Sequence, residues 1–155
     1  MELKDIRSGE RLLKFRESYR DQIDGWYNGF LHVFIIYSIG FLLMFYYILH
    51  LDGILLLELL VVPITFIICN IFEWALHKYV MHKPQSFPGA RAIYSRHTLQ
   101  HHQFFDHKEM RFAGSHDWRV TFFPPYALII FTFMSIPGLI LLSVIFTPNV
   151  GWLFI

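Results

Sequence analysis

Three long apolar stretches constrain the fold of this chain more than any other feature. Residues 30–49, FLHVFIIYSIGFLLMFYYIL, carry no charge and match the roughly 20 residues that a helix needs to cross the hydrocarbon of a bilayer. Residues 54–72 contain a single charged residue, Glu58, and residues 126–146 contain none. Because lipid offers the backbone no hydrogen-bond partners, each stretch is expected to be a membrane-spanning helix.

Two polar segments lie outside these stretches, and the sequence from Phe122 to the end is apolar again. Residues 1–29 are charged and are expected to form a cytosolic or interfacial N-terminal segment. Residues 74–121 form a polar segment rich in histidine. We therefore expect residues 1–155 to be one membrane domain, an all-α, polytopic transmembrane helical bundle with a cytoplasmic, histidine-rich metal-site segment.

The third stretch admits two arrangements around its internal proline. One is a span over residues 126–146 that is kinked or broken at Pro137 and Gly138, followed by a turn at residues 147–149 and the start of another span. The alternative is a tighter hairpin that turns at residues 135–138.

The positive charges predict which side of the membrane the polar segments occupy. All 13 Lys and Arg residues lie either before the first span or in and beside the histidine-rich segment. Two spans return the chain to its starting side, so both basic segments share that side, and the excess of positive charge predicts the cytoplasm. The net charge of +1 gives no reason to expect a nucleic-acid partner.

Histidines are concentrated in the polar segment, where six of the nine in the chain fall within residues 73–107. Five of them form two short clusters, HxxxxH and HxxxHH, which are His77 and His82, then His97, His101 and His102. Neutral imidazole is the commonest metal ligand among side chains and suits iron, zinc, copper and nickel. An isolated loop histidine is usually solvated, but two clusters at one membrane face favour a metal site.

Helix geometry indicates how these rings converge. On a continuous α-helix, residues five apart differ by about 140°, so His77 and His82 would not meet. Lys83 precedes Pro84, and a residue before proline is pushed out of the α-helical region, so the helix should end near His82 and free that ring. In the second cluster, His97 and His101 have the spacing at which side chains meet on one helix face.

The other histidines have weaker claims to be ligands. His107 and His116 are more often solvated or supporting residues than ligands in such positions. His32 and His50 lie in or at the end of the first span and are expected to be structural. Glu73, one turn before His77, is either a hydrogen-bond partner for a ligand or an interfacial residue at the end of the second span.

Signatures of other enzyme classes are absent from the sequence. There is no HExxH, GxSxG, P-loop or GxGxxG pattern. The single cysteine, Cys69, excludes both an internal disulfide and a cluster held by several thiolates.

The histidine clusters and their flanks resemble a known family. EWALHKYVMH at residues 73–82, followed by YSRHTLQHH at residues 94–102, resembles the fatty acid hydroxylase and sterol desaturase superfamily of integral-membrane enzymes. DWRVTFFPP at residues 117–125 resembles the segment that leads into the later membrane helices of that family. The resemblance covers about residues 70–125 and places His77 and His82 in the first histidine box, and His97, His101 and His102 in the second.

The resemblance implies a function and its partners. It implies a di-iron site with O2 as co-substrate, electrons from a separate reductase, and hydroxylation or desaturation of a fatty acyl chain, sphingolipid or sterol in the membrane. The family carries a further histidine box beyond its last membrane helices, whereas no histidine follows His116 here. The chain is therefore expected to be the N-terminal part of a longer enzyme.

Two other interpretations stay open. HKYVMH also resembles the first box of carotenoid hydroxylases, which makes a carotenoid an alternative substrate. In a different class, the chain is a membrane metal-binding protein without oxygenase activity, or a truncated remnant.

The charge distribution gives a testable topology. A cysteine introduced as Gly89→Cys should be labelled from the cytoplasm, and one introduced as Asp52→Cys from the opposite side, in a cysteine-accessibility experiment. Labelling of residue 89 from outside and of residue 52 from inside would show that this layout is wrong.

Overall fold

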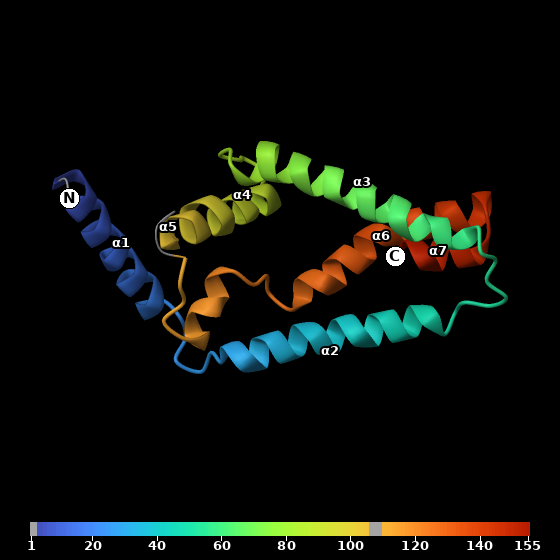
Figure 1. The fold of residues 1–155 in the computed structure, drawn as a ribbon, viewed down its shortest axis with the longest axis horizontal. Coiled ribbons are helices and arrows are strands. Elements are labelled where there is room, and N and C mark those ends of the chain that lie inside the picture. The colour runs from blue at the N-terminus through green and yellow to red at the C-terminus, as the bar shows by residue number, and fades with distance from the viewer. Residues whose placement is uncertain (1–2, 106–109) are drawn as a thin grey trace. The chain divides into compact units, whose positions relative to one another are not determined.

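The computed structural model describes residues 3–105 and 110–155, and within these residues it contains helices and turns but no strand (Figure 1). The all-helical prediction is confirmed for this part of the chain. The chain divides into two compact units. Unit 1 comprises residues 1–32 and 74–122, and unit 2 comprises residues 33–73 and 123–155.

Three helical stretches are long and apolar enough to cross a membrane. They are α2 (Gly29–Ile48), the composite stretch Glu58–Met81, and α6 (Tyr126–Ile145). The composite stretch consists of the 3-10 turn η1 (Glu58–Leu60), α3 (Val61–Leu76) and the π-helical turn η2 (His77–Met81).

The second stretch differs at both ends from the expected 54–72. Its helix begins at Glu58, because the residues before Glu58 form a turn. The Glu58 carboxylate accepts a hydrogen bond from the Leu55 N–H in that turn at 2.8 Å. At the other end the helical winding continues past the apolar residues to Met81. It ends two residues before Lys83, where the following proline disfavours helix.

In unit 2 the chain passes through Pro137 without turning. The alternative hairpin at residues 135–138 is wrong, because α6 continues to Ile145. The Ser135 hydroxyl donates to the carbonyl groups of Phe131 and Thr132, at 3.1 and 2.9 Å.

The turn after α6 lies at Phe146 and Thr147 and leads into α7 (Pro148–Phe154). Thr147 caps α7, its hydroxyl accepting a hydrogen bond from the Val150 N–H at 3.3 Å. Helix α7 packs back against α6. Gly151 makes this approach possible, because a Cβ atom there would overlap Ser143 Oγ and the Leu139 carbonyl.

Unit 1 packs the N-terminal helix against the histidine-rich segment. Its elements are α1 (Leu3–Asp21), α4 (Pro88–Tyr94), the π-helical η3 (Ser95–His101), α5 (His102–Phe104) and the 3-10 turn η4 (Ser115–Val120). Its buried core is small and consists of Tyr19, Ile23, Phe104 and Val120.

Charged hydrogen bonds supplement this small core. Arg16 donates to the Phe104 carbonyl at 2.8 Å. Arg20 binds both carboxylate oxygens of Asp117 at 2.8 Å, and Asp117 also accepts from the Ala113 N–H at 2.8 Å. Burial opposes ionisation of Asp117, but the Arg20 hydrogen bonds keep its pKa below the ordinary value. Helix α1 thereby contacts α5, which begins with His102 of the second histidine box, and η4, which packs against η3.

Candidate metal centre

The first histidine pair lies on the π-helical turn η2. His77 begins this turn, and His82 follows its end with φ −100° and ψ 1°, outside helical geometry. The prediction that the helix ends near His82 is therefore confirmed. In a π-helix the residue five positions along lies one turn above the first. The Nε2 atoms of His77 and His82 are accordingly 3.0 Å apart.

The second box repeats this local geometry. Element η3 is also π-helical, and it brings His97 together with His102, five residues later, with their Nε2 atoms 3.1 Å apart. Sequence spacing on a regular α-helix had instead paired His97 with His101. Both boxes thus use the same spacing of five residues, and in both the helix is wound to match it.

The two pairs converge on one volume. His77 Nε2 lies 2.9 Å from His97 Nε2, which joins the boxes. Potential ligand atoms of His77, His82, His97 and His102 all lie within 4.8 Å of one another. Two imidazoles bound to one tetrahedral ion at 2.0–2.1 Å would have their nitrogens about 3.4 Å apart. The four side chains therefore fit a single metal ion.

A hydrogen bond between the boxes holds them at this separation. The Thr98 hydroxyl, on η3, donates to the Met81 carbonyl at the end of η2, with an O···O distance of 2.5 Å. Carbonyl groups in the last turn of a helix lack partners within the helix, so Thr98 satisfies one of them. This contact could not be predicted from the sequence, because a threonine in a polar segment carries no signal of its own.

His101 lies beside the four converging rings without joining them. Its ring stacks on His97 with a centroid distance of 5.7 Å and contacts Phe105 edge-on at 5.2 Å. It also makes a hydrogen bond to the Val120 backbone. Whether His101 binds metal stays a prediction.

The remaining candidates lie elsewhere or stay open. His32 is buried and its Nδ1 lies 2.7 Å from the Tyr27 hydroxyl, and His116 contacts the same tyrosine ring at 5.5 Å. In unit 2, His50 Nδ1 lies 2.8 Å from the Tyr46 carbonyl, so His32 and His50 both have the partners of structural residues. Glu73 is exposed, and both interpretations of it stay open. His107 lies outside the described residues.

Burial keeps the imidazoles of the second box in the form that binds metal. Burial, with a smaller contribution from the neighbouring imidazoles, His102 first, lowers the pKa of His97 to about 4. The pKa values of His101 and His102 are also lowered, chiefly by burial. A metal ligand must be deprotonated, so these rings are ready to bind at neutral pH.

In comparisons with known proteins, no family model, no curated protein and no solved structure matches this chain. The resemblance to the fatty acid hydroxylase and sterol desaturase superfamily therefore rests on the histidine motifs, and the metal centre rests on its own geometry.

The geometry separates ligands from neighbours in a way that can be measured. His77→Ala, His82→Ala, His97→Ala and His102→Ala should each weaken the binding of one metal ion by more than about tenfold, since loss of even a supporting group weakens metal sites by roughly 10–100-fold. His101→Ala should retain this ion, and His50→Ala should bind as the unmodified protein does. Titration with metal in the presence of a competing chelator measures all six. A His102→Ala variant that binds as tightly as His101→Ala would contradict the four-histidine set.

The lowered pKa of His97 predicts a pH dependence of the metal-free protein. The unfolded chain takes up this proton near pH 6.5 and the folded chain only near pH 4, so between these values the unfolded state binds more protons. Stability should be full above pH 6.5 and fall as the pH is lowered toward 4. Thermal unfolding in chelator at a series of pH values should show a shallower loss for His97→Gln, with His50→Gln as control. Parallel curves for His97→Gln and the unmodified protein would refute this account.

Proposed function

We propose that this chain holds iron at the four-histidine site and acts as part of a di-iron, O2-dependent hydroxylase or desaturase of a membrane lipid. The observation that carries the proposal is the convergence of four imidazole nitrogens at the end of a membrane-length helical stretch. At that position the C–H bond of a bilayer lipid can reach the metal site. An electron donor can reach the same site from solution.

The donor set supports iron among the metals that histidine binds. Imidazole suits iron, zinc, copper and nickel, but catalytic zinc sites use three protein ligands and zinc has no redox chemistry. Iron bound by these side chains would supply the chemistry that activates O2. The chain's own residues position it: the two π-turns aim the rings, Thr98 joins the boxes, and burial keeps His97 neutral.

Two irons would require more ligands than the four that converge. His101 is the next candidate in position, since its ring is adjacent to His97 and its pKa is lowered by burial. The remaining ligands would come from histidines outside this cluster. The di-iron assignment comes from the family resemblance, whereas the geometry supports the first ion.

The same proposal includes the orientation of the site. The histidine boxes are placed on the cytoplasmic side because all 13 Lys and Arg residues belong to the segments before α2 and around the boxes. A soluble reductase would then have access to the site. The lipid is a fatty acyl, sphingolipid or sterol substrate, with a carotenoid as the alternative.

A second function has one observation in its favour. Four ligands around one ion are the arrangement of a closed structural site, and the converging set in the described residues contains four histidines. A membrane metal-binding protein without oxygenase activity would therefore use the same residues.

Metal and lipid analysis together distinguish the two functions. The complete protein purified from host membranes should contain iron, and membranes that express it should consume O2 and reducing equivalents. One oxygen atom should enter a lipid and the other leave as water, or a pair of hydrogens should be lost. Mass spectrometry of the acyl, sphingoid, sterol and carotenoid pools detects either product, and His97→Ala should abolish it while His50→Ala does not. An iron-loaded protein that leaves every pool unchanged would refute the oxygenase and favour the binding protein.

A further inference from the structure

Unit 2 contains a buried carboxylate and no lysine or arginine that could pair with it. Residue Glu58 is 8% exposed, and residues 33–73 and 123–155 of this unit contain no lysine or arginine. Burial of an unpaired charge is unfavourable. Ionisable residues within membrane-spanning sequence most often mark a binding or transport function.

Neutral donors hold the Glu58 carboxylate in place. One oxygen accepts from the Thr147 hydroxyl at 2.5 Å, and the other accepts from the Leu55 N–H at 2.8 Å and the Asn149 amide at 3.0 Å. Asn149 also exchanges two hydrogen bonds with the Asp52 backbone. A carboxylate has about four acceptor positions, so three neutral donors orient this one and leave a position for a charged partner.

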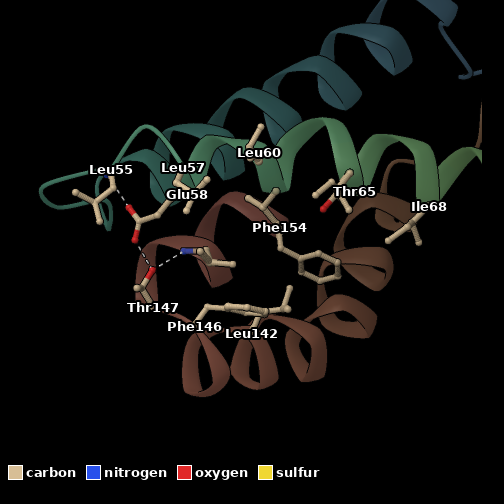
Figure 2. Close-up of a pocket in the computed structure, with 13 residues that line it drawn as sticks. Leu55, Leu57, Glu58, Leu60, Thr65, Ile68, Leu142, Phe146, Thr147 and Phe154 are labelled. Carbon is tan, nitrogen blue, oxygen red and sulfur yellow. Dashed lines mark hydrogen bonds between the residues drawn. The ribbon is translucent and has the colours of Figure 1, made fainter.

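The carboxylate forms one end of an apolar pocket. The pocket has a volume of about 710 Å³, within the roughly 300–1,000 Å³ of small-molecule sites. Its apolar lining comes from η1 and α3 on one side and from α6, α7 and their connection on the other, and includes Leu60, Ile64, Ile68, Leu142, Phe146 and Phe154. Glu58, Thr65 and Thr147 are its polar lining residues. Figure 2 shows Glu58 and Thr147 together at one end and Ile68 at the other.

We propose that this pocket binds a single-chain amphiphile with a primary ammonium head group. The alkyl chain lies along the apolar lining and the ammonium pairs with Glu58. A fatty acid would place a second negative charge beside the carboxylate, and an alcohol would leave the charge unpaired. An ammonium group donates three hydrogen bonds, and a charge-assisted bond is stronger than a neutral one. This site lies in unit 2 and is independent of the metal-dependent function proposed above.

Crosslinking with matched probes tests the head group. The protein, in nanodiscs of phosphatidylcholine, is exposed to photoreactive diazirine derivatives of octadecylamine, octadecanoic acid and octadecanol. The quaternary ammonium of the host lipid cannot donate a hydrogen bond and does not mimic the probe. The amine probe should label α3, α6 and α7 at least about tenfold more than the acid or the alcohol probe. Unlabelled octadecylamine should suppress this labelling. Equal labelling by the acid and the amine would overturn the proposal.

Two kinds of variant test the pocket itself. Glu58→Gln keeps the size of the side chain but removes its charge, so amine labelling should fall about tenfold toward that of the alcohol. Ile64→Trp narrows the pocket and should reduce labelling by all three probes. Phe66→Trp, also on α3 but outside the pocket lining and 69% exposed, is the matched control and should label normally. Undiminished amine labelling of Glu58→Gln, or equal labelling of the two tryptophan variants, would show that the pocket does not bind the amine.

Discussion

The match between histidine spacing and helical winding is the constraint on which the candidate metal centre depends. Residues five apart diverge on an α-helix but lie one turn apart on a π-helix. Both boxes place their converging histidines five apart, and in both the chain adopts π winding at that point. π turns are rare and occur mostly at functional sites. The five-residue spacing of the histidines accounts for the π turns, and the π turns bring the spaced rings together. A regular α-helix through either box would send one ring of each pair away from the other.

The winding is effective only because the rest of unit 1 holds the boxes together. The buried apolar core of this unit is small, and a small core supplies little stabilisation by itself. Arg16 and Arg20 reach from α1 to Phe104 on α5 and to Asp117 on η4. The charged N-terminal segment therefore has a structural role: charge-assisted hydrogen bonds replace part of the apolar packing that this polar region lacks.

The sequence predicted the features that depend on local composition. Uncharged stretches of membrane length identified α2 and α6, and the lysine before Pro84 located the end of the second helical stretch. The sequence did not reveal the features that depend on distant contacts or on unusual winding. A period of 3.6 residues was assumed, so His97 was paired most closely with His101, although His102 was also predicted to be a ligand. Pro137 and Gly138 were expected to kink or break the third span; the helix is not broken there, since α6 continues to Ile145, and the kink stays a prediction.

Glu58 illustrates why contacts between distant residues stay hidden in a sequence. Its hydrogen-bond partners Thr147 and Asn149 lie 89 and 91 residues away along the chain, so no local pattern indicates them. The two polar sites nevertheless follow one physical rule. Inside a helix the backbone N–H and C=O groups hydrogen-bond to one another, but at its ends some of these groups lack a partner within the helix. Glu58 therefore binds the free Leu55 N–H where the second helical stretch begins, and Thr98 binds the free Met81 carbonyl where it ends. Polar side chains gather at these termini because the backbone there needs partners, and the same gathering provides the groups from which a metal site and a ligand pocket can be built.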